Sequence, residues 1–250
     1  MLCLPVVAPA ISMADLNSDL GEGESPARTR ALMRVVTSAN VACGGHAGTP
    51  ESMDRCVRLA AAFSVRLGAH PGLPGTFGRG LAAIRPGELE TLLIHQVSAL
   101  AMVAKARGRS LEHVKLHGAL YHATEQDPAL AAAYVRTMRR WFPGLRILAL
   151  AGGRVAARAR ASGTPVWEEA FVDRGYCSDG SLVPRGLAGA LITSPTAVQR
   201  RIRDVRQGLG IETGDGGRWR IRPQTWCVHA DTPGAPALAR AAAAVLFPEP

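Results

Sequence analysis

Short apolar runs recur along the chain, and each is followed by a polar cluster and then by a segment with helical periodicity. The runs are about four to six residues long, which is typical of strands buried in a sheet. The helical segment of the second repeat begins with Thr49 and Pro50, which are favoured as the N-cap and the first residue of a helix. Regular alternation of strands and helices predicts a parallel sheet.

The pattern contains seven strand-then-helix units. Because this repetition extends over the length of one domain, it favours a closed or nearly closed β/α barrel over two domains. Segment 210–223, GIETGDGGRWRIRP, does not fit the repeat and predicts a small hairpin before the last strand. The helices are expected at about 26–37, 49–63, 86–106, 154–163, 194–208 and 235–247, with one more that opens at Asp127 and Pro128.

The first residues, MLCLPVVAPAIS, are apolar but do not have the pattern of a signal peptide. They lack a basic segment and are interrupted by Pro5 and Pro9. Because Met13 comes just before the first polar cluster, we interpret residues 1–13 as a non-native or disordered extension and 14–250 as a single barrel domain. No other segment is predicted to be long and apolar enough to span a membrane.

Composition indicates an ordinary globular protein, with 47% hydrophobic and 20% charged residues. The net charge is +9, but the basic residues are scattered over many helical segments and aromatic residues make up only 5%. This pattern favours a solvated, arginine-rich surface over a nucleic-acid-binding face. Five cysteines are widely spaced without a C-x-x-C pair, which indicates a reduced, cytoplasmic environment.

Polar and ionisable residues fall where the predicted strands end. In a β/α barrel the carboxyl ends of all strands open on one face, and that face carries the active site. We therefore expect side chains from distant parts of the chain to converge there. They are Asp15, Asn17, Asp19 and Glu22 after the first strand, His46 and His70 after the next two, Lys115 and His117 at the fourth, Glu168, Glu169, Asp173 and Arg174 at the sixth, and His229 and Asp231 at the seventh.

The seven histidines differ in their surroundings. His46 and His70 lie between small residues, where glycine allows sharp turns and close approach of a ligand. His95 lies on a predicted helix among apolar residues, and His113 and His122 flank the fourth strand end, so we predict structural roles for these three.

Six motifs, in one order, resemble the LamB/YcsF family over roughly residues 14 to 235. They are ADLNSDLGEGE, SANVACGGHAG, GAHPG with FGRG, HVKLHGALYH, EEAFVDRGYCSDGSLVPR with GALI, and CVHADTP. The chain departs from the family pattern at Ser18, Gly45, Thr49, Leu116, His122 and Ala230, and the loop between His70 and Phe77 is short.

The resemblance implies a seven-stranded, TIM-like β/α barrel of the glycoside hydrolase/deacetylase type. It also implies ATP-dependent opening of 5-oxo-L-proline to L-glutamate, with release of ADP and phosphate, in a complex with the 5-oxoprolinase subunits B and C. No P-loop, G-x-G-x-x-G, G-x-S-x-G or H-E-x-x-H motif is present, so the sequence does not locate an ATP site.

The family's motif residues divide by chemistry into two sets. We predict catalytic roles for Asp15, Asp19, His46, His70, Lys115 and His117, and substrate binding by Asn17, Glu22, Arg79, Glu169, Asp173, Arg174, Asp179, Arg185, His229 and Asp231.

Opening a lactam needs a base for water, cations for phosphoryl or carboxylate oxygens, and donors for the oxyanion. Lys115 suits a phosphoryl group or oxyanion, and Arg174 or Arg185 suits a carboxylate. Asp15 or Asp19, together with His46 and His70, would hold and deprotonate the water. Lys115→Ala is expected to abolish turnover and leave the fold intact.

Two alternative functions also fit these residues. Asp15, His46 and His70 would suit a divalent transition metal, which would make the protein a metal-dependent amidohydrolase or deacetylase acting without ATP. The other alternative is a non-catalytic subunit or carbohydrate-binding protein, against which the number of ionisable strand ends argues.

Overall fold

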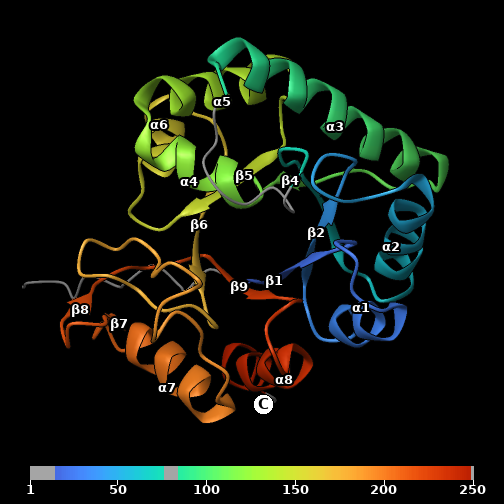
Figure 1. Cartoon of the computed structure of the whole chain (residues 1–250). Coiled ribbons are helices and arrows are strands. Elements are labelled where there is room, and N and C mark those ends of the chain that lie inside the picture. The colour runs from blue at the N-terminus through green and yellow to red at the C-terminus, as the bar shows by residue number, and fades with distance from the viewer. Residues whose placement is uncertain (1–14, 76–83, 249–250) are drawn as a thin grey trace, which may run out of the picture.

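The strands of the chain close into a parallel barrel, as the sequence predicted (Figure 1). The computed structural model describes residues 15–75 and 84–248, and within them seven strands pair in the order β1-β2-β3-β4-β5-β6-β9. The barrel closes because β9 pairs with both β1 and β6. The strands are β1 (Asp15–Leu20), β2 (Ser38–Ala42), β3 (Arg66–His70), β4 (His113–Val114), β5 (Arg146–Leu150), β6 (Val166–Phe171) and β9 (Thr225–His229).

Helices surround the strands (Figure 1). Four of them begin at a Ser, Thr or Asp side chain that accepts a hydrogen bond from the first turn and is followed by proline. Thr49 is one of these N-caps, as predicted. The helices are α1 (Pro26–Met33), α2 (Pro50–Ala62), α3 (Pro86–Ala106), α4 (Gly118–Gln126), α5 (Pro128–Trp141), α6 (Arg154–Ala161), α7 (Pro195–Arg206) and α8 (Ala235–Leu246).

The elements differ from the sequence prediction at two places. Helix α4 was not predicted: it begins at Gly118, directly after the HVKLH segment, and α5 follows it with only Asp127 between them. Helix α1 ends at Met33 and not near residue 37. The predicted hairpin is present as β7 (Ile211–Glu212) and β8 (Arg218–Trp219), which pair antiparallel at the periphery in Figure 1.

The barrel has an apolar layer outside the strands and a polar column inside them. Along β1 the side chains alternate, so Leu16 and Leu20 join the hydrophobic core. Asn17, on the other face, reaches Glu169 of β6 across the barrel, with 2.9 Å between its Nδ2 and the Oε1 of that glutamate. The polar interior differs from the apolar filling usual in such barrels, and a buried polar group there is costly unless it has a hydrogen-bond partner.

Helix α3 is long and apolar enough to span a membrane by length and composition, although the sequence predicted no such segment. In the structure it packs against β3, α2 and α5, the position of a helix in the outer ring of a barrel. Its apolar character is therefore used in part to cover the sheet.

Two predictions fall outside the described residues, namely the N-terminal extension at 1–13 and the substrate-binding role of Arg79. The four cysteines in the described part of the chain, which are Cys43, Cys56, Cys177 and Cys227, are free thiols.

Candidate active site at the barrel mouth

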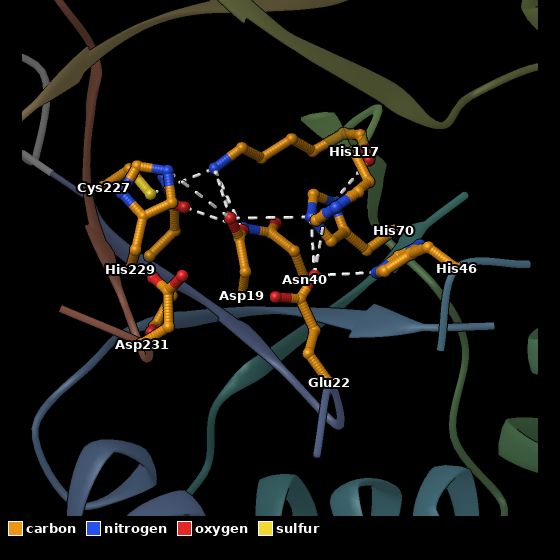
Figure 2. Close-up of polar contacts among 12 residues, drawn as sticks. Asp19, Glu22, Asn40, His46, His70, His117, Cys227, His229 and Asp231 are labelled. Atoms are coloured by element: carbon orange, nitrogen blue, oxygen red, sulfur yellow. Dashed lines mark hydrogen bonds and ion pairs between the residues drawn. The ribbon is translucent and has the colours of Figure 1, made fainter. Parts of the chain in front are cut away.

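A cavity of about 560 Å³ opens at the carboxyl ends of the strands, where the sequence placed the site. Asp19 lies centrally in the polar cluster, with a group of histidines on one side and His229 with Cys227 on the other (Figure 2). The predicted residues that line the cavity are Asp19, Glu22, His70, Lys115, His117, Arg174, Arg185 and His229.

Lys115 is buried at the floor of the cavity and is held by acidic partners. Its Nζ lies 3.0 Å from Asp19 Oδ1 and 3.1 Å from Glu169 Oε1. Burial alone would lower the pKa of this amine, but the negative charges of its neighbours raise it well above the usual value. Lys115 is therefore an ammonium ion at neutral pH. Its Nζ also lies 3.0 Å from Cys227 Sγ.

The two carboxyls beside Lys115 respond differently to burial. Burial raises the pKa of Asp19, but the charges of His70 and Lys115 outweigh it and lower the pKa below the usual range. Glu169 lies deeper, and burial raises its pKa despite the charge of Lys115. Asp19 is therefore the permanent counter-ion of the lysine, and Glu169 is the carboxyl that takes up a proton more readily.

Three histidines surround Glu22. Its Oε1 lies 2.7 Å from His46 Nε2, 2.8 Å from His117 Nδ1 and 3.3 Å from His70 Nε2. The rings come from the loop after β2, the end of β3 and the residue before α4, so a parallel barrel is what brings them together. Burial lowers the pKa of His46 to about 4, which keeps that imidazole neutral.

His229 forms a pair with the buried carboxylate of Asp173. Its Nδ1 lies 3.0 Å from Asp173 Oδ1, and the same carboxylate accepts hydrogen bonds from the backbone N–H of His229 and the hydroxyl of Thr232. Burial raises the pKa of Asp173, but His229 and these hydrogen bonds outweigh it and lower the pKa. An ionised Asp173 fixes the proton of His229 on Nδ1 and leaves Nε2 facing the cavity.

The arginines at the rim have different tasks. Arg174 donates from Nε to the Ala190 carbonyl and from Nη2 to the Val183 carbonyl, so it braces the loop after β6. Arg185 lines the cavity and pairs with Asp231 across 3.2 Å at the surface. Arg185 is therefore the better placed of the two to receive an anionic group.

Asn17 lies below the mouth, and the prediction that it binds substrate has no support from its contacts. Its Nδ2 donates to Glu169 and Thr225, and its Oδ1 accepts from Asn40 Nδ2 at 2.7 Å. Asn40 also donates to Asp19 at 2.8 Å and accepts from His113 at 2.6 Å through its Oδ1. These amides connect the floor of the site to the barrel interior.

The expectation that Asp15 joins His46 and His70 is wrong. Asp15 begins β1, whereas His70 ends β3, so the two residues lie at opposite ends of the barrel. The Asp15 carboxylate accepts hydrogen bonds from hydroxyls of three residues and from the guanidinium of Arg66. Burial raises its pKa, but these hydrogen bonds outweigh it and lower the pKa. Asp15 is a structural carboxylate at the base of the barrel.

Two other acidic residues also lie apart from the cavity. Asp179 is exposed and accepts hydrogen bonds from the backbone and hydroxyl of Ser181, which shapes a turn. Glu168 accepts a hydrogen bond from the backbone of Gly152 and pairs with Arg160 on the outside of the barrel. His113 is buried at the base of β4 and contacts Asn40, which fits the structural role predicted for it. His95 is exposed on α3, so the structural role predicted for it has no support from its position.

Sequence reasoning missed several residues of the cavity. His122 was predicted to be structural but lines the cavity, because α4 carries it back toward the mouth. Tyr121, also on α4, is buried there, and its hydroxyl has no hydrogen-bond partner among the described residues. Cys227 contacts Lys115 because it lies two residues before His229 on the inward face of β9. The alternation of inward positions along β9 was the one signal available for Cys227.

The fold and the mouth define a seven-stranded β/α barrel with a buried, ionisable site at the carboxyl ends of its strands. Residues 14–248 match the LamB/YcsF family, and the chain belongs to it. It is 44% identical over 238 residues to the A subunit of 5-oxoprolinase from Heliobacterium modesticaldum, covering 93% of each chain. It is 43% identical over 232 residues to the A subunit of 5-oxoprolinase from Methylococcus capsulatus, covering 90% of this chain and 89% of the other.

A solved structure shows the same architecture. The lactam utilization protein from Thermus thermophilus superposes with a TM-score of 0.85 at 40% sequence identity, covering 93% of this chain and 95% of the other. The match therefore spans nearly the whole of both chains.

Proposed function

We propose that the chain is the lactam-opening A subunit of an ATP-dependent 5-oxoprolinase, which converts 5-oxo-L-proline to L-glutamate. The observation that carries the proposal is the mouth itself, where a protonated lysine, a histidine–aspartate pair and a rim arginine face one cavity. Relatives that are 41–44% identical over most of the chain bear the name of the 5-oxoprolinase A subunit, which supports the same conclusion.

The substrate has one carboxylate and one cyclic amide, and the mouth offers a partner for each. Arg185 is half-buried at the rim, and its surface partner Asp231 is easily exchanged for another carboxylate. A guanidinium binds a carboxylate through two parallel hydrogen bonds, which fixes its orientation. With the carboxylate at Arg185, the lactam ring would extend toward the floor of the cavity.

His229 is the base that the geometry favours for the attacking water. Asp173 holds its Nδ1 proton, so the Nε2 lone pair faces the cavity 3.9 Å from Asp19 Oδ2. A water deprotonated at Nε2 would attack the lactam carbon, and the same ring would return the proton to the leaving amine. This assignment replaces Asp15 with the Asp173–His229 pair.

Lys115 is the cation for the oxygen of the lactam, whether as an oxyanion or after phosphorylation. Its ammonium lies in the cavity floor beside Asp19, and a donor to a developing oxyanion contributes about 3 kcal/mol to catalysis. Negative charge on the substrate oxygen would compete with Asp19 for the lysine, so the contact strengthens as the reaction proceeds.

We propose that the ATP-dependent step takes place only in the complex with the other subunits. Transfer of the γ-phosphoryl group of ATP to the lactam oxygen would release ADP and make the ring carbon susceptible to water. Cleavage of the ring C–N bond would then leave an acyl phosphate, whose hydrolysis gives glutamate and phosphate. We propose that subunits B and C are required for the phosphorylation. We also propose that the complex works in the cytoplasm, where free thiols are stable.

The test is glutamate formation from 5-oxoproline by the purified chain, with and without ATP and with and without subunits B and C. Glutamate that forms only when ATP and both partners are present is the expected result. Failure to form glutamate with the full set of components would refute the proposal.

A second function is favoured by the three histidines around Glu22, since such a ligand set suits a metal-dependent amidohydrolase. That enzyme would open its amide without ATP or partners. Substrate turnover by the isolated chain, lost on treatment with a chelator, would favour this function over the first.

A further inference from the structure

Four ligand-type side chains at the edge of the cavity converge on one point. The nitrogens of His46, His70 and His117 lie within 3.3 Å of a single oxygen of Glu22. The three ring side chains are at most 6% exposed, whereas the Glu22 side chain is 18% exposed toward the cavity. The cluster is therefore closed on the protein side and open on the side from which a ligand would enter.

The hydrogen bonds of His70 show which of its ring nitrogens is free to bind a ligand. His70 Nδ1 lies 2.8 Å from the carbonyl oxygen of Lys115, which only accepts, so Nδ1 carries the proton. In a neutral imidazole the Nε2 atom of His70 then has a bare lone pair. That lone pair faces Glu22 Oε1 at 3.3 Å and Asp19 Oδ2 at 3.5 Å, both of which are acceptors, and His117 Nδ1 at 3.1 Å, which can donate to it. The lone pair of His70 Nε2 therefore receives either the proton of His117 Nδ1 or a metal ion bound among the three rings and Glu22.

The surroundings hold the rings in place as the outer partners of a metal site do. A ligating histidine usually donates its second nitrogen to a carbonyl or carboxylate, which is the contact that His70 makes with the Lys115 carbonyl. The rings of His46 and His117 stack with their centroids 3.6 Å apart. Gly72 packs beside them, and a Cβ at that position would lie 2.3 Å from His46 Nδ1. The chain therefore leaves space for these rings at a position where only glycine fits.

We propose that His46, His70 and His117, together with Glu22, bind one divalent transition-metal ion such as zinc at the barrel mouth. Three imidazole nitrogens and a carboxylate oxygen suit such an ion, with nitrogen-to-zinc distances of about 2.0–2.1 Å. Glu22 is the ligand exposed to the cavity, so it is the one that water or substrate would displace. This set keeps two of the residues predicted from the sequence and replaces Asp15.

The site extends the chemistry of the cavity in a defined way. A bound ion would polarise an amide oxygen or a water molecule placed between it and Lys115. Asp19 lies next to both groups, 3.5 Å from His70 Nε2 and 3.0 Å from Lys115 Nζ. Metal binding does not depend on 5-oxoproline as the substrate, so it is tested separately from the proposed function.

The experiment uses the full chain, stripped with a chelator and titrated with Co²⁺ and with Zn²⁺. We expect one Co²⁺ per chain, with the visible absorption bands of a four- or five-coordinate site, and displacement of these bands by Zn²⁺. His46→Ala and His117→Ala are expected to weaken binding by more than the roughly 10–100-fold that loss of an outer partner costs. His95→Ala, on the exposed face of α3, is the matched control and should bind as the parent does.

Thermal unfolding with and without metal keeps the test decisive if a variant is unstable, because a ligand that binds only the folded state raises Tm. Glu22→Gln, which keeps the shape of the side chain, is expected to retain the bands with a changed spectrum and weaker binding. A folded parent protein that shows no Co²⁺ bands, or equal binding by the parent and His46→Ala, would overturn the proposal. The cluster would then be held by hydrogen bonds alone, with His117 Nδ1 as the donor to His70 Nε2 and Glu22 Oε1.

Discussion

Replacing Lys115 with methionine should destabilise the fold as well as abolish turnover, and this revises the expectation from sequence that the fold stays intact. The ammonium is the shared counter-charge of Asp19 and Glu169, and all three side chains are at most 6% exposed. Removal of one partner from a buried ion pair typically costs 3–5 kcal/mol, because the remaining charge has no solvent and no partner. For a chain of this length that corresponds to a decrease in Tm of about 6–20 °C.

The pH dependence of folding stability tests whether the lost charge pairing causes the destabilisation of Lys115→Met. Burial already raises the pKa of Glu169, and without the lysine it rises further. A carboxyl whose pKa is higher in the folded state than in the unfolded state binds a proton on folding, so stability falls as pH rises above the unfolded value of about 4.3. In the parent, the charges of His70 and Lys115 lower the pKa of Asp19 despite its burial, and the stability that this contributes is lost only as the pH falls below the unfolded value of about 3.9. The deficit of the variant is therefore smaller near pH 5, where Glu169 can bind a proton, and approaches its full size by about pH 8.

The assay is urea unfolding of Lys115→Met and the parent at both pH values, with glutamate formation measured in parallel. The control is Lys105→Met, since Lys105 is the other lysine of the chain and is exposed near the end of α3. It should match the parent in both measurements. A Lys115→Met variant with parental stability at pH 8, or with a deficit that is the same at both pH values, would refute the charge-pairing argument.

Two further substitutions test the site. Asp173→Asn keeps the shape of the residue but no longer fixes the proton on His229 Nδ1, so kcat for glutamate formation should fall roughly 10²–10⁴-fold with a smaller change in KM; an unchanged kcat would exclude His229 as the base. Gly72→Ala places a methyl group 2.3 Å from His46 Nδ1 and should weaken Co²⁺ binding at least tenfold, whereas Gly87→Ala, which meets nothing within 4 Å, should leave binding unchanged. Equal Co²⁺ affinity of the two glycine variants would contradict the packing of His46 described above.

The sequence predicted the barrel and most of its mouth because parallel strands place all their carboxyl ends on one face. The sequence did not predict at which level along the barrel each inward-facing side chain lies. Asp15 and Asp19 both face inward along β1, but four residues at about 3.3 Å each separate them by ~13 Å along the strand. The upper residue meets Lys115 and the lower one meets Arg66. Alternation along one strand cannot distinguish them, since the difference lies in which residues the neighbouring strands bring to each level.

Helix α4 shows a second limit of sequence reasoning. It starts at Gly118, immediately after the HVKLH segment that contains β4, so the polar run that indicated a strand end is followed at once by a helix. His122 was therefore interpreted as a flanking residue, although one turn of α4 carries it from His117 back to the cavity. Residue preferences do not predict the start of this helix, because it has no side-chain cap and begins at a glycine with φ of +44°.

The use of lysine at position 115, in a chain that otherwise relies on arginine, follows from the space at the floor of the mouth. Nζ lies within 3.1 Å of Asp19, Glu169 and Cys227, and 5.2 Å from the centre of the Phe171 ring. A single nitrogen with three protons can point one donor at each polar neighbour, whereas a planar guanidinium directs its donors into a flat fork. A compact ammonium is also able to transfer its contact from Asp19 to a substrate oxygen by a small rotation. Lysine at this position therefore both neutralises the buried carboxylates of the barrel interior and serves the reaction at its mouth. One substitution there should for this reason lower both stability and activity.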